Sequence, residues 1–240
     1  MKRILPFIII LVVLAAALTS AWYLTRTIPA SQNPAANQPA AASTGSPQAS
    51  PAQSANPVVT GVPGADPPHV LGPANAPVKL EEFGDFECPP CGIFHPILEQ
   101  MRTEFGDKLQ ITFREFPLVP THQHALPAAS AAEAAGLQGK FWEMHDLIYE
   151  HQNDWKKEFD VRPIFEGYAK QIGLDVERFK RDVGSDAVAL RIMQDGKRGH
   201  SLGVKGTPTV FMNGREVSFE NLPAEKLRVV IQSELRGAGQ

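Results

Sequence analysis

The chain has 240 residues, of which 20% are charged, and its formal net charge is −3. No basic stretch and no interleaving of aromatic with basic residues stands out, so we do not expect a nucleic-acid partner. The chain contains two cysteines, Cys88 and Cys91. Two are too few for a framework of several disulfides, and the second Cys-X-X-Cys pair of most structural zinc sites is missing.

The first 24 residues predict a membrane anchor. Lys2 and Arg3 precede an uncharged, mostly apolar stretch over residues 4–24, which at roughly 1.5 Å per residue spans about 31 Å, enough to cross the hydrocarbon core. The positive charges at its start favour an N-terminus inside and export of the rest. The alternative is a cleaved signal peptide, because Thr19-Ser20-Ala21 resembles a cleavage site. In both cases the remainder is expected outside the cytoplasm.

Residues 25–68 are predicted to form a disordered linker. Nine of these 44 residues are proline, small side chains fill most of the rest, and only Arg26 and Asp66 are charged. Such a composition cannot bury enough apolar surface to fold. One globular domain therefore remains, over residues 69–236, which is long enough for a single hydrophobic core.

The domain is predicted to be of the α/β class. A strand is expected at 78–83, and the helix that follows runs from Cys88 to about Phe105, with a kink rather than an end at Pro96. The other predicted elements are a strand at 108–116, helices at 125–138, 141–151, 162–172 and from 175 onward in two pieces, strands at 209–212 and 215–217, and a helix at 224–235. Asn213-Gly214 between the last two strands is a strong hairpin signal.

The Cys-Pro-Pro-Cys motif at residues 88–91 opens the first predicted helix. Cys88 would be the N-cap, with Pro89 at the first helical position, where its missing N–H costs nothing. The positive end of the helix favours the thiolate of Cys88 over the thiol. Pro90 removes one backbone donor and leaves chiefly the N–H of Cys91 to bond that thiolate. A single Cys-X-X-Cys of this kind indicates a redox pair, in which Cys91 attacks a mixed disulfide formed at Cys88.

Three stretches make the chain resemble the DsbA-like branch of the thioredoxin superfamily. They are residues 82–91, 138–146 and 203–209, the last leading to Asn213-Gly214, and they follow the family's order. The resemblance implies a thioredoxin fold with a helical insertion at about 122–204. It also implies that Cys88 is the exposed nucleophile and Cys91 the buried resolving cysteine. Pro208 would be held in cis beside the pair, and Thr207 would offer its backbone to the substrate.

The resemblance further implies an enzyme that exchanges disulfides with unfolded or thiol-bearing exported proteins, and we expect the oxidase direction. A quinone-linked membrane protein would reoxidise the pair, and no cofactor beyond the Cys88–Cys91 disulfide is expected. The domain would face outward from the bacterial cytoplasmic membrane. Pro89-Pro90 differs from the Pro-His of the best-known strong oxidants, and these two residues help set the redox potential. A reductase or isomerase fed by a membrane thiol carrier is therefore the alternative.

Three further residues near the motif are candidates for tuning it. Glu82 and Asp85 flank the end of the first predicted strand, where a carboxylate could take the proton of Cys91 through water. A solvated surface position is nevertheless the favoured interpretation for both. His95 lies one turn beyond Cys91 and is expected to be solvated or to pack on its helix.

His122 and His124 suggest a second alternative of a different class. Together with the two cysteines they could form a Cys₂His₂ site, and the protein would then be a copper-binding chaperone without turnover. The favoured interpretation of the two histidines is a loop followed by the start of a helix, and no metal site is predicted.

Overall fold

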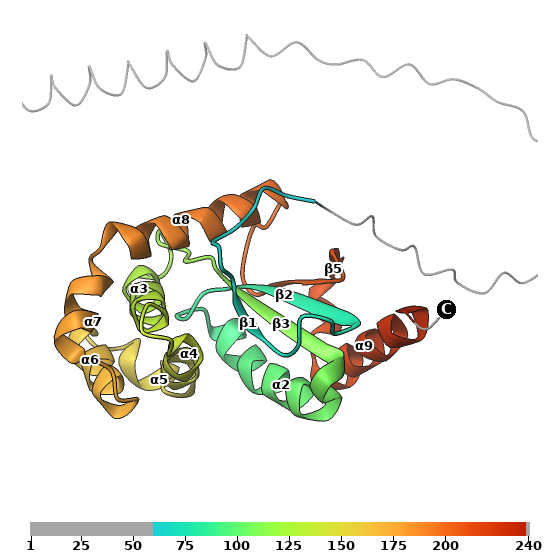
Figure 1. Ribbon diagram of the computed structural model, residues 1–240, viewed down its shortest axis with the longest axis horizontal. Coiled ribbons are helices and arrows are strands. Elements are labelled where there is room, and N and C mark those ends of the chain that lie inside the picture. The colour runs from blue at the N-terminus through green and yellow to red at the C-terminus, as the bar shows by residue number, and fades with distance from the viewer. Residues whose placement is uncertain (1–59, 239–240) are drawn as a thin grey trace, which may run out of the picture. The chain divides into compact units, whose positions relative to one another are not determined.

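The computed structural model describes residues 60–238, and Figure 1 shows their arrangement. The anchor or signal peptide predicted at 1–24 lies outside the described residues, as does most of the predicted linker. Within residues 60–238, no helix combines the length and apolar character needed to span a bilayer.

A five-stranded mixed sheet forms the centre of the domain. Its strands are β1 (His69–Leu71), β2 (Val78–Gly84), β3 (Leu109–Glu115), β4 (Thr209–Met212) and β5 (Arg215–Val217), in the order β1-β3-β2-β4-β5. The central pair β2 and β3 is parallel, with Val78 opposite Leu109, and the other pairs are antiparallel. Four of the five strands were predicted within a residue or two. Strand β1 was missed, because three residues are too few to show alternation.

Two helices cover one face of the sheet and a third covers the other (Figure 1). Helices α2 (Pro89–Phe105) and α9 (Ala224–Ala238) pack on the face that carries alternate residues of β2, β3 and β4. Helix α8 (Asp186–Ser201) lies on the opposite face, where a Cβ added at Gly199 would come within 2.6 Å of the Phe116 ring. Helix α2 continues through Pro96, as predicted. Two short 3₁₀ helices, Gly106–Lys108 and Phe219–Asn221, complete the sheet domain.

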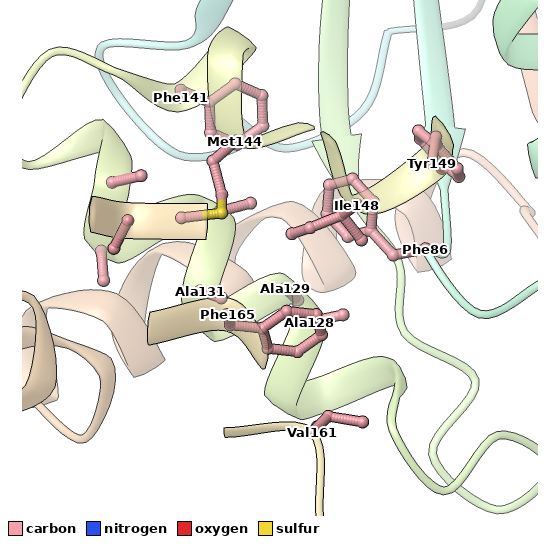
Figure 2. Packing of buried hydrophobic residues seen from close by; sticks show 14 of the residues in the cluster. Phe86, Ala128, Ala129, Ala131, Phe141, Met144, Ile148, Tyr149, Val161 and Phe165 are labelled. Carbon is pink, nitrogen blue, oxygen red and sulfur yellow. The ribbon is translucent and has the colours of Figure 1, made fainter. Parts of the chain in front are cut away.

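The remaining helices form a block between β3 and β4 in the chain, and Figure 1 shows them to one side of the sheet. They are α3 (Ala125–Gly136), α4 (Phe141–Glu150), α5 (Gln152–Trp155), α6 (Arg162–Gln171) and α7 (Val176–Val183), and α8 follows them. Alanines of α3 are fully buried and let the neighbouring helices approach closely. Figure 2 shows Phe86, just after β2, against Tyr149 and Ile148 of α4. The block is thereby fixed to the end of the strand that precedes the cysteines.

The C-terminal end of the predicted linker is folded, which corrects the boundary at residue 68. Ala65 is 2% exposed, and its N–H donates to the Asp195 carboxylate at 2.7 Å. Arg114 donates to the carbonyl of Ala65 at 2.9 Å, and Arg198 donates to that of Val62 at 3.0 Å. The proline-rich composition did not indicate that residues 61–67 are folded. Their backbone groups bond to side chains of β3 and α8, and such bonds leave no apolar pattern in the sequence.

Candidate active site

The loop between β2 and α2 places both cysteines at the N-terminal end of α2. Cys88 is the N-cap residue and two prolines occupy the first helical positions, as predicted. Cys91 is 0% exposed. The amide of Gln152 in α5 donates to the carbonyls of Phe86 and Cys88, at 2.7 and 2.9 Å. Gln152 therefore fixes the loop from the helical block, and the sequence pattern carried no signal for this role.

The two sulfurs have opposite acidities. The pKa of Cys88 is lowered from 9.0 to about 6, chiefly by a hydrogen bond from the Cys91 thiol and then by the Thr207 side chain and the Cys91 backbone N–H, against burial and the charge of Asp85. Burial raises the pKa of Cys91, and the neighbouring Cys88 and Glu82 raise it further. The low pKa of Cys88 was predicted, but with the Cys91 backbone N–H as its chief cause, whereas the Cys91 side chain contributes most.

The loop before β4 lies against Cys88. The Thr207–Pro208 peptide bond is cis, as the resemblance implies. The Cys88 thiol donates to the carbonyl of Thr207 at 3.2 Å. The expected exposure of the nucleophile is not found, since Cys88 is 4% exposed. Thr207 contacts its sulfur, whereas the adjoining Pro89 and Pro90 are exposed.

Both candidate carboxylates are buried, so the favoured interpretation as solvated surface groups was wrong. Glu82 is 2% exposed, and burial, followed by the charge of Cys88, raises its pKa to about 8. Asp85 is 1% exposed and accepts from the backbone N–H groups of Glu87 and Leu118, at 2.8 and 2.9 Å, and from His122 Nδ1 at 2.7 Å. Asp85 therefore orders the chain next to Cys88, while Glu82 lies near Cys91.

The histidines form contacts other than the suggested Cys₂His₂ site. His122 pairs with Asp85, and His124 Nε2 donates to the carbonyl of Glu158 at 2.9 Å. In the part of the chain that the structure describes, the one set of three potential ligands within 4.8 Å of one another is His95, His145 and Asp146. The structure thus does not assemble the predicted alternative.

His95 packs inside the domain instead of facing solvent. Its ring lies 5.3 Å from the ring of Tyr149, and its Nε2 pairs with the Asp146 carboxylate at 3.1 Å. His145 of α4 binds the same carboxylate oxygen through Nδ1 at 2.9 Å. No role was predicted for His145 or Asp146, although both lie within the stretch 138–146 that carries the resemblance.

A family model described as thioredoxin matches residues 65–233. Two curated relatives are similar over part of their length. The Na⁺/H⁺ antiporter NhaA 1 of Salinispora arenicola is 44% identical over 151 residues, which is 62% of this chain and 22% of that protein. The antiporter NhaA 3 of Salinispora tropica is 38% identical over 178 residues, 72% of this chain and 26% of that protein. The chain thus spans about a quarter of the length of these relatives.

Solved structures with the same fold include thiol-disulfide enzymes. The oxidised form of BdbD from Bacillus subtilis is 25% identical with a TM-score of 0.65, and the match covers 75% of this chain and 100% of that one. A variant of alpha-DsbA1 from Wolbachia pipientis is 18% identical with a TM-score of 0.61, over 72% and 93% of the two chains. A thioredoxin-like oxidoreductase from Silicibacter pomeroyi is 24% identical with a TM-score of 0.56, over 71% and 94%.

Proposed function

Because this chain belongs to the thioredoxin family, as a DsbA-like oxidoreductase, we propose that it exchanges disulfides with thiol-bearing proteins through Cys88 and Cys91. The observation that carries the proposal is the contrast between the two sulfurs on one turn of α2. Cys88 has a lowered pKa of about 6, and Cys91 is fully buried with a raised pKa. Cys88 is therefore largely a thiolate at neutral pH. Cys91 is a buried thiol, which can react only with a sulfur inside the protein, such as that of Cys88.

In the proposed reaction, a substrate thiolate attacks Cys88 in the disulfide, and Cys91 leaves. The mixed disulfide lies beside Thr207, whose backbone would receive the substrate chain, and Pro208 would shape that surface. A second substrate thiolate then attacks the substrate sulfur and releases Cys88 as a thiolate. The substrate has lost two electrons and the Cys88–Cys91 pair has gained them.

We propose the oxidase direction. At pH 7 a Cys88 pKa of about 6 stabilises the reduced pair by about 1.4 kcal/mol relative to an ordinary thiol, which raises the potential by about 30 mV. This is about a fifth of the roughly 150 mV between thioredoxin and the strongest oxidants of the superfamily. The thiolate therefore favours oxidation, and the two residues between the cysteines also help set the potential.

Exposed apolar side chains near the cysteines support unfolded chains as substrates. Ile93, two residues after Cys91, is 69% exposed, and Phe159 is 94% exposed. The loop of Phe159 is held near the motif because the preceding Glu158 accepts from His124. The backbone N–H of His124 in turn donates to Glu87, next to Cys88. We propose that these two side chains bind apolar segments that folded substrates would bury.

We further propose that the domain lies on the outer side of a bacterial cytoplasmic membrane, held there by residues 1–24. Its redox partner would be a membrane protein, either a quinone-linked protein that reoxidises the pair or a thiol carrier that reduces it. The curated relatives carry the matching segment within a longer protein named as an antiporter, which supports a place beside a membrane. Their transport activity belongs to those proteins and is not proposed for this chain.

A redox titration against glutathione tests the function and its direction together. The fraction of reduced protein would be read with an alkylating mass tag on the wild type and on Cys88→Ser. A reversible two-electron transition above about −200 mV supports an oxidase, and a value near −270 mV, that of thioredoxin, would assign a reductase. If the wild type gave no reversible transition, the proposed exchange activity would be rejected.

A further inference from the structure

A small cavity lies beneath α2, next to Glu82. It measures about 10 Å³ and is lined by side chains of β1, β2, β3, α2 and α4, among them Glu82, His145 and Tyr149. His145 Nε2 and the Tyr149 hydroxyl are buried and have no hydrogen-bond partner among the protein atoms. A volume of this order is close to the least that holds one water molecule, which also needs two to four polar partners. The three side chains supply that number.

A path from this cavity to solvent runs through His145. Its Nδ1 pairs with the Asp146 carboxylate at 2.9 Å, and the side chain of Asp146 is 38% exposed. Although burial acts to raise the pKa of Asp146, the hydrogen bonds from His145 and His95 lower it, so the group is a carboxylate. A carboxylate can only accept, and His145 must therefore carry its proton on Nδ1. This leaves Nε2 as a bare acceptor, free to take a proton from a water in the cavity.

The charges around His145 suit a ring that is neutral at rest. Burial lowers the pKa of His145, against the hydrogen bond and charge of Asp146, and His95 of α2 lowers it as well. Glu99 of α2 acts in the opposite direction. His95 and Glu99 also line the cavity, together with the titratable groups of Glu82 and Tyr149. A neutral ring beside a carboxylate can take up a proton on one nitrogen and release another from the second.

We propose that a water in this cavity connects Glu82 to His145, and that the chain Glu82, water, His145 and Asp146 exchanges the proton of Cys91 with solvent. This inference rests on the proposed function, since it describes how the buried sulfur of that reaction gains and loses its proton. His145 acts on the sulfur only through Glu82, and it is therefore a positioning residue for proton transfer.

The proton balance can be followed during oxidation of the reduced pair. The thiolate of Cys88 attacks a disulfide reagent, forms a mixed disulfide and releases one reagent thiolate. The carboxylate form of Glu82, which predominates above its pKa of about 8 and whose charge acts on Cys91, then takes the proton of Cys91. The Cys91 thiolate attacks Cys88, which releases the second reagent thiolate. The proton passes from Glu82 through the water to His145 Nε2, while the proton on Nδ1 leaves by way of Asp146. During reduction the same groups carry one proton inward to the departing Cys91.

A single kinetic measurement can report the reactions of Cys88 and Cys91 as two separate phases. Reduced full-length protein is mixed rapidly with dithiobis(nitrobenzoate), with a chelator present, and release of the coloured thiolate is followed in time. The first phase reports attack by Cys88 and the second reports attack by Cys91. In His145→Gln we expect an unchanged first phase and a second phase slowed at least about tenfold, since general acid–base groups contribute about a hundredfold or more. The slowed phase should become faster with increasing buffer concentration, because buffer then replaces the relay.

Matched variants control for structural damage. His69→Gln makes the same change at a largely buried histidine that pairs with Glu133 and does not line the cavity, and both of its phases should match the wild type. Asp146→Asn alters the half-exposed end of the path and should slow the second phase even if His145→Gln folds poorly. In Glu82→Gln the second phase should be slow, and adding His145→Gln should slow it no further, because the two residues act in series.

Different results would contradict the proton relay and the proposed disulfide exchange. A second phase that is unchanged in His145→Gln and Asp146→Asn would overturn the relay. A second phase that is slowed without any response to buffer would also overturn it, because that result indicates a packing defect. If the wild type released no second thiolate at all, the cysteine pair itself would not form a disulfide, and the proposed function would fail instead.

Discussion

At pH 5, reduced Cys88 is expected to react with iodoacetamide about 30 to 60 times faster than an ordinary thiol, apart from steric hindrance. Its pKa is lowered from 9.0 to about 6, so about 9% of it is thiolate at pH 5, against about 0.01% of an ordinary thiol. The ratio of about 900 is reduced about 16- to 30-fold by the weaker nucleophilicity of a low-pKa thiolate. At pH 7 the same arithmetic leaves an advantage of only about three- to sixfold. Acidic pH is therefore the informative condition.

The assay follows alkylation of the reduced protein from pH 4 to pH 9 by peptide mass spectrometry, which reads Cys88 and Cys91 separately. Cys88 is 4% exposed, which lowers its absolute rate at every pH, so the position of the inflection is the quantity to compare. In Cys91→Ala the hydrogen bond that contributes most to the low pKa is removed, and the inflection should rise by about one to two pH units. An inflection above about pH 8 in the wild type would show that the pKa of Cys88 is not lowered, and an unchanged inflection in Cys91→Ala would show that the Cys91 thiol does not lower it.

Three other predictions follow from the site and the fold. Cys91→Ser should accumulate mixed disulfides between Cys88 and substrate proteins on non-reducing gels, and normal turnover by this variant would contradict the role of Cys91. Glu82 has a folded-state pKa of about 8, above its ordinary 4.5. Its ionisation is therefore easier in the unfolded chain, and the free energy of unfolding falls as the pH rises from 4.5 to 8. Glu82→Gln should therefore raise the free energy of unfolding at pH 8 by up to about 4 kcal/mol and leave it almost unchanged at pH 4 in urea titrations. A chain that starts at residue 69 should be about 2–5 kcal/mol less stable than one that starts at residue 60, because it leaves buried partners of the 61–67 backbone unpaired. Equal urea midpoints for the two chains would show that this segment does not contribute to the fold.

Local rules were enough to predict the turn of helix that carries the cysteines. Cys88 at the N-cap and proline at the first helical position follow from backbone chemistry within a few residues. The continuation of α2 through Pro96 also follows locally, because the apolar pattern persists beyond it. The hairpin at Asn213-Gly214 is equally local, since a two-residue turn requires those residue types. The direction of the Cys88 pKa shift could also be predicted, because Cys91, whose thiol and backbone N–H lower that pKa, lies only three residues along the chain.

Local sequence patterns predicted the residues that we propose for the redox chemistry, whereas the surroundings of those residues depend on how the whole domain packs. Glu82 and Asp85 look like surface carboxylates in the sequence, and they are buried because the helical block packs over the ends of β2 and β3. Gln152 and His145 reach the cysteine loop and its cavity from α5 and α4, more than fifty residues along the chain. No local pattern encodes such contacts, since burial and pKa depend on every element that packs around a group, whereas helix capping depends only on the residues next to it.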